Sequence, residues 1–385
     1  MSSIAVVAGD ASGDLYGASL AHALRKIVPD VTIWGAGGPR MEAAKVELVA
    51  DFSLVSSIGV VESSKTIPSL LISYLRLRTL IRYRRPDALV VIDFGGFNRR
   101  LSGFARRIGV KTVYFIPPGC WRRMNRGTAK TAKCADLFLT PFQWSAERLR
   151  VAGANVEYVG HPLLDVVEET RVEKTRFCME FGLDVDTRIV ALLPGSRKAE
   201  ISHILPVLLD AADIIRGEAE RVQFVVAAAP GVFEMVRRGV GRRACDGARV
   251  IVIPNRACDT LAAADLALVA SGTATLEAAI LGTPMVIVYR GSVAMAAEKI
   301  LRNRVLEDYI GLPNIIAGQG ICPELVGKQA TGRNIAVEAI RLLEDNSLRE
   351  ETKWNLSKVR SQLGQPGAVR RSAELIAKFA GLQAR

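Results

Sequence analysis

Residues 88–98 of this 385-residue chain read ALVVIDFGGFN. Five apolar residues, three of them β-branched, predict a strand that is buried on both faces, as in a parallel sheet. The run ends in Asp93, and two glycines then lead into a helical pattern near residues 98–108. A buried strand that turns directly into a helix is the repeating unit of α/β folds.

The same alternation of strand and helix continues on both sides of this stretch. Further helical patterns lie near residues 14–27, 65–85 and 143–152. The expected strands are 4–7, 31–34, 88–92, 112–116, 137–139 and 156–159, and then 189–193, 224–227, 250–253, 266–269 and 285–289. Two such blocks predict two doubly wound parallel sheets, with ligands at the carboxyl ends of the strands.

The length of the chain suits about two domains of ~150 residues each. The stretch 165–175 is charged and poor in strand formers, so we place the boundary there. The predicted domains are 1–165 and 170–345, followed by a helical segment, 346–385, whose return to the first domain stays open.

The composition is that of a globular protein, with 49% hydrophobic and 23% charged residues. The six cysteines are scattered and form no Cys-x-x-Cys pair, which argues against a zinc ribbon or a disulfide framework and favours a reducing cytosol. The first residues, MSSIAVV, lead straight into a strand pattern, so we expect no signal peptide. Because no apolar run reaches the ~18 residues of a membrane span, we expect a soluble protein.

The net charge of +12 is concentrated in the first domain. Residues 1–165 hold 22 Lys and Arg against 13 Asp and Glu, and residues 76–126 hold thirteen basic residues against only Asp87 and Asp93. Such a basic region indicates an anionic partner: nucleic acid, acidic lipid or a phosphorylated substrate. Charge alone does not choose between them.

Two loops of the first domain carry candidate residues. Asp93 directly follows a buried strand, where its carboxylate could deprotonate an acceptor hydroxyl; the alternative is a helix N-cap, a position that Asn98 could also fill. The first strand ends in AGDASGD (8–14), in which Gly9 and Gly13 permit a tight turn. The spacing is not that of a dinucleotide fingerprint, so a plain turn and an anion-binding turn stay equally open.

Two loops of the second domain indicate phosphate binding. In LLPGSRKAEI (192–201), Arg197 stands at the start of a helix, where its planar guanidinium suits phosphate oxygens; a surface salt bridge is the alternative. In ASGTATLE (270–277), backbone N–H groups and hydroxyls at a helix start suit a pyrophosphate, and Glu277 suits ribose hydroxyls. Helix capping alone would leave Glu277 unexplained.

Two weaker signals favour structural roles. Asp184 and Asp186 match an Asp-x-Asp metal motif, but they precede a strand, so we expect a solvated turn. His161 has no Cys or second His near it in the sequence, so we expect a hinge or packing residue.

Together these segments resemble the lipid-A-disaccharide synthase family over almost the whole chain. The matching stretches are 8–14, 35–41 (GAGGPRM), 58–62 (IGVVE), Asp93 with 97–98, 141–142, 159–165 (VGHPLLD), 192–201, 270–289 and 312–314 (LPN). The resemblance implies an α/β fold of two Rossmann-like domains (GT-B) that face each other across a cleft, with C-terminal helices. It also implies a metal-independent, inverting transfer from UDP-2,3-diacylglucosamine to 2,3-diacylglucosamine 1-phosphate in lipid A biosynthesis.

The resemblance carries the following residue roles onto this chain. Asp93 and Arg197 are the essential catalytic residues. The UDP-sugar is bound by Gly195, Ser196, Arg197, Ser271, Gly272, Thr273, Glu277, Asn314 and Gln329, and the acceptor loop contains Ser12, Gly13 and Asn98. No metal or other cofactor and no nucleic acid is implied, and a homodimer stays open.

The chain departs from the family pattern on the acceptor side. The usual Glu of the first loop is Asp10, the usual Pro after the catalytic Asp is missing from 94–96, and the segment 117–123 reads PPGCWRR. The segments that would bind UDP match the family pattern, so we expect the same donor nucleotide, UDP. Three alternatives stay open: a glycosyltransferase with a different lipid acceptor, a UDP-N-acetylglucosamine 2-epimerase-like isomerase, and a non-catalytic module that binds anionic lipid or nucleic acid.

A helix expected near residues 70–85 suggests how acylated substrates are reached. Leu70, Tyr74, Leu77 and Ile81 fall on one stripe, and Arg78, Arg82 and Arg85 form a neighbouring one. The arginines predict peripheral contact with the anionic inner face of the cytoplasmic membrane. The alternative is a helix that packs its apolar stripe on the sheet and leaves its arginines in water.

Overall fold

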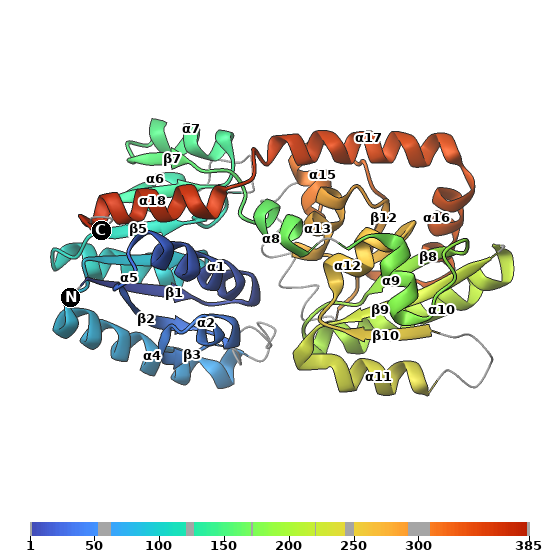
Figure 1. The fold of residues 1–385 in the computed structure, drawn as a ribbon, viewed down its shortest axis with the longest axis horizontal. Coiled ribbons are helices and arrows are strands. Elements are labelled where there is room, and N and C mark those ends of the chain that lie inside the picture. The colour runs from blue at the N-terminus through green and yellow to red at the C-terminus, as the bar shows by residue number, and fades with distance from the viewer. Residues whose placement is uncertain are drawn as a thin grey trace. The chain divides into compact units, whose positions relative to one another are not determined.

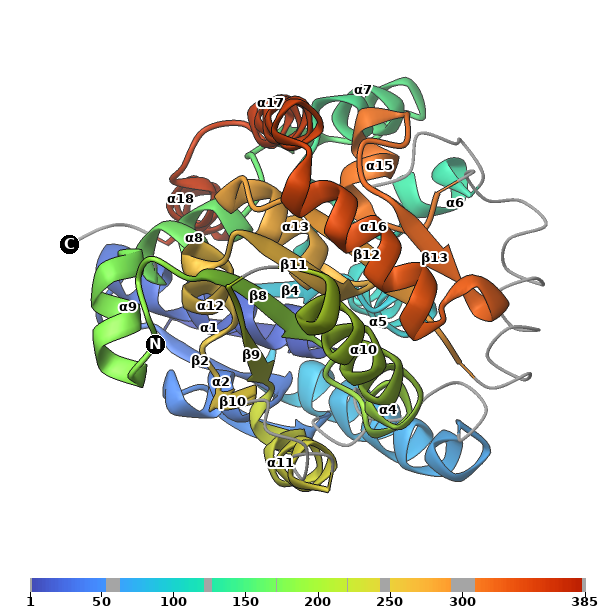
Figure 2. The ribbon, with the colours of Figure 1, turned by 90° about the vertical axis from the view of Figure 1, so that its right-hand side faces the viewer.

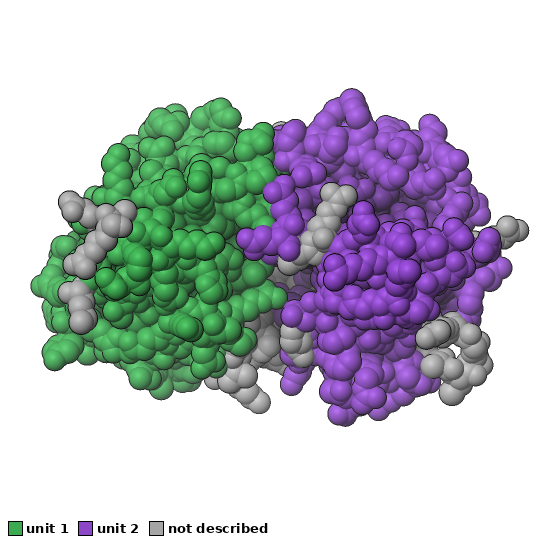
Figure 3. All heavy atoms as spheres, in the orientation of Figure 1, with its two compact units in different colours: residues 1–58, 62–165, 363–385 green, residues 59–61, 166–362 purple. Residues whose placement is uncertain are grey.

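The computed structural model describes residues 2–52, 63–120, 127–170, 172–219, 221–242, 250–291 and 309–382. The chain forms two compact units (Figure 3). Unit 1 contains the described residues up to Asp165 together with 363–382, and unit 2 contains 166–362. The matched stretch 58–62 and residues 121–123 of the divergent segment lie outside the described residues.

Unit 1 is built on a parallel sheet of seven strands in the order β3-β2-β1-β4-β5-β6-β7. The strands are β1 Ser3–Ala8, β2 Thr32–Gly37, β3 Glu47–Asp51, β4 Ala88–Ile92, β5 Thr112–Phe115, β6 Leu137–Thr140 and β7 Val156–Tyr158. All six strands expected in the first half are present, and β3 is an addition. The central strand β4 is buried along its whole length, because it pairs with β1 on one side and β5 on the other.

Helices pack on this sheet through apolar side chains at helical spacing. They are α1 Ala11–Ile27, α2 Pro39–Ala43, α4 Ser63–Arg84, α5 Gly95–Arg107, α6 Thr128–Ala132, α7 Gln143–Val151 and α18 Ala368–Ala380, and α8 Leu163–Thr170 passes into unit 2. Leu77 and Ile81 of α4 and Leu101 of α5 join the core on one face of the sheet. The predicted apolar stripe of α4 is thus confirmed as a core-facing stripe.

The C-terminal helix α18 belongs to unit 1 and lies along α1 (Figure 1). Asp165, where the chain leaves unit 1, accepts hydrogen bonds from the backbone N–H groups of Gly367 and Val369. Arg371 of α18 donates from Nη2 to the carbonyl of Val159 at 2.7 Å. The end of the chain is therefore tied to the segment at which unit 1 was interrupted.

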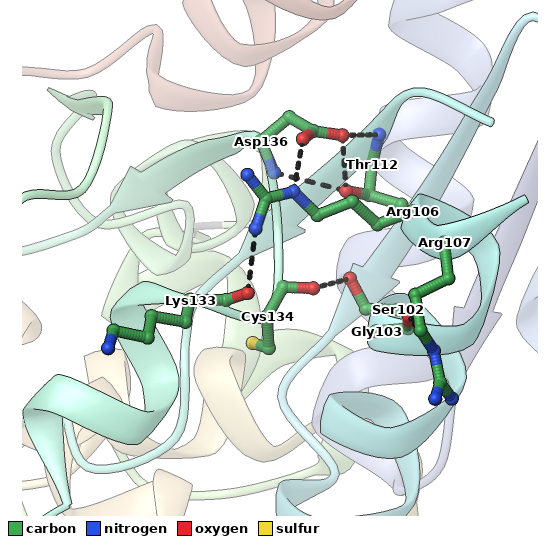
Figure 4. A network of polar contacts seen from close by, with 8 residues as sticks. All are labelled: Ser102, Gly103, Arg106, Arg107, Thr112, Lys133, Cys134 and Asp136. Carbon is green, nitrogen blue, oxygen red and sulfur yellow. Dashed lines mark hydrogen bonds and ion pairs between the residues drawn. The ribbon is translucent and has the colours of Figure 1, made fainter. Parts of the chain in front are cut away.

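The helix after Asp93, α5, is anchored at its far end by the polar network of Figure 4. Arg106 Nε donates to Asp136 Oδ1 at 2.6 Å, and the other carboxylate oxygen of Asp136 accepts from the N–H and the hydroxyl of Thr112. The hydroxyl of Ser102 donates to the carbonyl of Cys134 at 2.7 Å. These bonds fix α5 to the starts of β5 and β6, and so hold the helix that carries the Asp93 turn.

Unit 2 repeats the architecture with six parallel strands in the order β10-β9-β8-β11-β12-β13. The strands are β8 Arg188–Leu193, β9 Val222–Ala228, β10 Val250–Pro254, β11 Leu266–Ala270, β12 Met285–Tyr289 and β13 Glu324–Val326. All five strands expected in the second half are present, and β13 is an addition.

The helices of unit 2 cover both faces of its sheet. They are α9 Lys174–Phe181, α10 Lys198–Glu218, α11 Phe233–Gly241, α12 Ala257–Ala263, α13 Thr273–Leu281, α15 Leu312–Ala317, α16 Gly332–Glu344 and α17 Asn346–Gln362, with short 3-10 turns at Pro230–Val232 and Gly327–Gln329. Helices α10 and α16 pack side by side on the larger core (Figure 2), whereas α9 and α12 contribute to a separate cluster around Ile189 and Val225. Within the described part of the chain, no helix is long and apolar enough to cross a bilayer.

The two weak sequence signals have structural roles. Asp184 accepts hydrogen bonds from the N–H of Asp186 and the hydroxyl of Thr187 in an exposed turn, as expected. His161 is 7% exposed, packs against Phe142, and accepts the N–H of Leu163 at Nδ1. Burial lowers the pKa of His161 to about 3, so the ring is neutral and packs as a core residue.

Candidate active site

Most of the candidate residues follow the strands at the point where the strand order of each sheet reverses. This point lies between β1 and β4 in unit 1 and between β8 and β11 in unit 2. Parallel sheets bind ligands at such switch points, beyond the carboxyl ends of the strands. In unit 1, Ser12 and Gly13 follow β1 while Asp93 and Asn98 follow β4; in unit 2, Gly195, Ser196 and Arg197 follow β8 while Ser271, Gly272, Thr273 and Glu277 follow β11.

Asp93 stands in a strained turn. Its φ is +40°, and that of Phe94 is +54°, a conformation that residues other than glycine rarely adopt. The hydroxyl of Tyr114 on β5 donates to the carbonyl of Asp93 at 2.8 Å, which helps to hold the turn. Strain of this kind persists where surrounding contacts enforce it, and it clusters at functional sites.

The buried side chain of Asn98 also holds this turn in place. Helix α5 begins at Gly95, with Phe94 as its N-cap, so the alternative of a helix cap is excluded for Asp93 and Asn98 alike. Asn98 is instead fully buried, and its Nδ2 donates to the carbonyls of Val7, Ile92 and Asp93 at 3.2, 2.9 and 3.1 Å. Since Val7 is on β1 and Ile92 on β4, this amide locks together the two strand ends at the switch point.

The environment of Asp93 makes it a weaker acid than usual. Burial is the main cause, the nearby carboxylate of Asp10 adds to it, and together they raise the pKa of Asp93 to about 7. Hydrogen bonds from the N–H groups of Gly95 and Phe94 offset part of this rise. A carboxylate with a pKa near the working pH is well suited to accept a proton from a hydroxyl.

The loop after β1 brings Asp10 to this place. Asp10 is the N-cap of α1, and its Oδ1 accepts the N–H of Gly13 at 2.6 Å. A Cβ built on Gly9 would lie 2.0 Å from the ring of Phe94, so only glycine allows the aromatic ring to cover this loop. Ser12 is half-buried in the first turn of α1.

Asp14 ties this loop to the GAGGPRM stretch. Its buried carboxylate accepts hydrogen bonds from the backbone N–H groups of Gly38, Arg40 and Met41, at 2.8 to 3.0 Å. These groups open helix α2, so Asp14 caps α2 from α1. The matching stretches 8–14 and 35–41 are therefore joined to each other by hydrogen bonds.

In unit 2, Arg197 is the N-cap of α10, as the sequence indicates. Its guanidinium pairs with Glu200 at 3.1 Å, and its side chain is 46% exposed. The ion pair that the sequence suggested as the alternative is thus present. It involves a residue of the same helix end and leaves the guanidinium accessible.

The second loop of unit 2 lies beside the first. Register pairs Val269 of β11 with Leu193 of β8, so Ser271 and Gly195 leave adjacent strand ends. Helix α13 begins at Thr273 with Gly272 as its N-cap, and the half-buried Glu277 lies one turn further along, as expected. Two helix N-termini therefore open at one switch point, an arrangement suited to a diphosphate.

Asn314 stabilises this region from inside the protein. It is fully buried, its Nδ2 donates to the Cys322 carbonyl and to Glu324, and its Oδ1 accepts the N–H groups of Ile321 and Cys322. Its amide is thus occupied in holding the start of α15 to β13.

A chain of hydrogen bonds connects this region to the loop after β11. Ser271 donates from Oγ to the carbonyl of Ile310 at 3.0 Å, and the N–H of Ile310 donates to Glu324. Gln329 is exposed in a 3-10 turn, where its carbonyl accepts from Asn334.

Two of the predicted membrane-contact arginines, Arg78 and Arg82, lie on α4 and the third, Arg85, lies just beyond its end; the structure separates them. Arg78 is half-buried and lies over the ring of Phe104 at 4.3 Å, whereas Arg82 and Arg85 are exposed. The three arginines therefore do not form one free stripe. The same helix exposes a set of large apolar side chains away from the core: Leu71 is 56%, Ile72 66% and Leu75 50% exposed.

Sequence reasoning missed two acidic residues near the predicted ones. Asp10 was noted only as a departure from the family pattern, although it follows β1 much as Asp93 follows β4. Glu200 stands three residues after the N-cap of α10, the spacing at which a glutamate returns to a helix start. Across the described residues, no three His, Cys, Asp or Glu side chains gather in a group that could hold a metal ion.

Comparison with known proteins places almost the whole chain in one alignment. A family model described as lipid-A-disaccharide synthetase matches residues 4–379. The chain is 34% identical over 378 residues to the lipid-A-disaccharide synthase of Geobacter metallireducens, covering 98% of this chain and 97% of that protein. It is 38% identical over 371 residues to that of Syntrophus aciditrophicus, covering 96% of each.

Solved structures with the same fold are more distant in sequence. A structure described as S. aureus MnaA with UDP superposes with a TM-score of 0.69 at 14% identity, covering 100% of this chain and 98% of that one. The UDP-GlcNAc 2-epimerase of Neisseria meningitidis, bound to UDP-GlcNAc, gives 0.64 at 13%, covering 98% and 100%. A structure described as the glycotransferase of kitacinnamycin gives 0.60 at 16%, covering 98% of each chain. These similarities confirm the expected fold of two Rossmann-like domains (GT-B).

Proposed function

This chain belongs to the lipid-A-disaccharide synthase family, and we propose that Asp93 and Arg197 carry out its sugar transfer. Membership makes it a glycosyltransferase of lipid A biosynthesis. The proposed reaction joins the sugar of UDP-2,3-diacylglucosamine to 2,3-diacylglucosamine 1-phosphate through a β(1→6) linkage and releases UDP. The observation that carries the proposal is Asp93, held at a switch point with a pKa of about 7.

Asp93 acts on the acceptor as the general base. Its carboxylate takes the proton of the acceptor hydroxyl while the hydroxyl oxygen attacks C1 of the donor sugar. The braced turn of Asn98 and Tyr114 keeps the base in one position, so little reorganisation is needed at the moment of reaction. Attack opposite to the departing UDP inverts the configuration at C1.

Arg197 and the neighbouring helix starts act on the leaving group. As the bond between C1 and the phosphate oxygen breaks, its electron pair and negative charge pass to UDP. The guanidinium of Arg197 and the N–H groups at Ser271, Gly272 and Thr273 are suited to stabilise that charge. Glu277 is proposed to accept hydrogen bonds from the ribose hydroxyls.

The test is to incubate the purified protein with both acylated sugars and identify the products by mass spectrometry. We expect UDP and a tetra-acylated disaccharide 1-phosphate in equal amounts, and about 10²–10⁴-fold slower formation of both with Asp93→Asn. An epimerised donor without disaccharide would overturn the transfer in favour of an isomerase. Binding of both sugars without any product would indicate that the protein is a non-catalytic binding module.

We further propose that the transfer needs no metal ion, as the resemblance implies. The charge of the leaving UDP would then be balanced by Arg197 and the helix starts alone. Addition of EDTA should leave the rate unchanged, and added Mg²⁺ should not raise it. A rate that EDTA abolishes and Mg²⁺ restores would contradict this proposal.

Peripheral binding to the inner face of the cytoplasmic membrane is also proposed, through α4. Both substrates carry acyl chains, so the enzyme must meet them at a bilayer. Leu71, Ile72 and Leu75 present an apolar surface on α4, and positive charge comes from the exposed Arg82 of α4 and from Arg85, one residue beyond its end. Apolar insertion and attraction to anionic lipid together favour reversible binding.

Vesicle sedimentation separates these two contributions. Binding to anionic vesicles should fall with added salt and with Arg82→Glu and Arg85→Glu, because charge attraction is screened. Leu71→Asn, Ile72→Asn and Leu75→Asn together should weaken binding at every salt concentration. Tyr83→Ser, on an 86% exposed residue of the same helix outside this set, is the matched control. Equal binding of all variants would contradict the proposal.

A further inference from the structure

The start of α10 is folded around the carboxylate of Glu200. Oε2 of Glu200 accepts the backbone N–H of Ser196 at 3.1 Å and that of Arg197 at 3.3 Å, and Oε1 accepts Nη1 of Arg197 at 3.1 Å. The side chain of Glu200 is 17% exposed, against 46% for Arg197. A negatively charged group therefore already lies among the donors that open this helix.

Gly195 is shaped to this carboxylate. Its φ is +109°, and a Cβ at this position would lie 2.6 Å from Oε2 of Glu200. A glutamate three residues into a helix normally returns one bond to the N-cap N–H. Glu200 takes two backbone donors and a guanidinium, which is more than capping requires.

The donors that Glu200 uses are the kind that bind phosphate. Backbone N–H groups at a helix start and a planar guanidinium both prefer an anion with several oxygens. β8 and β11 are neighbours, so the start of α13 opens beside this set. A carboxylate and a diphosphate at this switch point would compete for the same guanidinium.

We propose that Glu200 is a positioning residue that competes with the diphosphate of the donor for Arg197, an inference that rests on the proposed function. In the ligand-free protein, Glu200 holds the guanidinium at the start of α10. When UDP or a UDP-sugar binds, Arg197 exchanges the carboxylate for phosphate oxygens. The return of Glu200 to Arg197 then favours release of UDP after transfer.

The test is the affinity of Glu200→Gln for UDP and for uridine, measured by calorimetry. Glutamine keeps an oxygen that accepts N–H bonds at this position but lacks the charge that holds Arg197. The Kd for UDP should fall up to about fivefold, the scale of one exposed ion pair. The Kd for uridine, which has no phosphate, should not change. An unchanged or higher Kd for UDP would overturn the inference.

A matched control is Glu234→Gln. Glu234 lies in the first turn of α11 and pairs with Arg237 three residues later at 2.8 Å, so it forms an ion pair of the same spacing at a helix start, with the order of the two residues reversed. This change should leave the Kd for UDP unaltered. An equal gain in affinity would mean that any lost negative charge has the effect, and the inference would fail.

A second background shows whether Glu200 acts through Arg197. In Arg197→Ala, the further change Glu200→Gln should give a smaller gain in UDP affinity than in the wild-type protein. A full gain there would overturn the exchange. If the wild-type protein binds no UDP, the proposed function fails; if it binds UDP and Glu200→Gln binds it no more tightly, only the exchange fails.

Discussion

Asp93 and Arg197 both follow the carboxyl end of a buried parallel strand, yet the two side chains are held in opposite ways. Asp93 lies in a strained turn braced by Asn98 and Tyr114, and burial raises its pKa. Arg197 is nearly half exposed and paired with Glu200. The proposed base is thus fixed before substrate arrives, whereas the cation proposed to bind the donor is paired within the protein and, in our proposal, stays so until an anion replaces its partner.

The largest expected effect tests the fixed half of this comparison. Asp93→Asn keeps the shape of the side chain but cannot take a proton, so turnover should fall about 10²–10⁴-fold. The Kd for UDP should not change, because UDP is assigned to unit 2. Steady-state kinetics and calorimetry measure the two quantities. Retention of most of the turnover would remove Asp93 as the base.

Protein stability gives an independent check on Asp93. Because its pKa is raised, the folded protein holds a proton that the unfolded chain loses, so stability should fall as the pH rises from about 4 to about 7. Asp93→Asn has no such proton to lose. At pH 8 the variant should be more stable than the wild type by up to about 4 kcal/mol, and the difference should shrink towards pH 4. Denaturant unfolding at both pH values measures it.

The next effect tests the exchangeable half. Arg197→Ala should lower turnover by about 10²–10³-fold, since its charge matters most when the leaving group becomes anionic. UDP affinity should change much less. In the wild type, UDP gains its contact with Arg197 only by breaking the ion pair between Arg197 and Glu200, so the net contribution of that contact to binding is small. A loss confined to UDP affinity, with normal turnover at saturation, would make Arg197 a binding residue only.

A smaller effect is expected from Glu277→Ala. Loss of a carboxylate that accepts ribose hydroxyls should weaken UDP binding about tenfold or more, with little change in turnover at saturating donor. Deoxyuridine diphosphate, which lacks one ribose hydroxyl, is the matched ligand. Calorimetry that gives the same Kd for UDP in the wild type and the variant would exclude the ribose role.

The smallest effect concerns the charge beside the base. Turnover should be about tenfold lower at pH 6 than at pH 9, because Asp93 must lose its proton first and its pKa is about 7. Asp10→Asn removes a negative charge near Asp93, so the rise of turnover with pH should move to lower pH. The shift should be less than about one pH unit, since burial is the larger cause of the raised pKa. An unchanged pH dependence of turnover would show that Asp10 serves only as a helix cap.

The sequence predicts every central strand of both sheets and the edge strands β7 and β10, but it misses the other two edge strands, β3 and β13. β4 is a fully buried apolar run, and such runs are readable without tertiary information. β3, ELVAD, lies at an edge with charged ends, and β13 has three half-buried residues at the other sheet's edge. The charged ends of β3 and the three-residue length of β13 hide both strands from a search for apolar, β-branched runs.

The candidate site divides in the same manner. The positions of Asp93, Arg197 and Glu277 after buried strands follow from the order of elements. The pKa of Asp93 does not, since it depends on burial and on Asp10, which another strand delivers. Likewise, the arginine stripe of α4 was derived from one helix alone, whereas Phe104 of α5 takes Arg78 out of it.

The return of α18 to unit 1 has a consequence for biosynthesis. Asp165 and α1 meet their partners, Gly367 and α18, only after the whole of unit 2 has been translated. At about 5–20 residues per second, synthesis of residues 166–362 separates the two events by about 10–40 s. During that time α1 lacks the contacts that α18 makes with it. A chain that ends before α18 therefore lacks the helix that packs on α1 and the partners of Asp165 and Val159.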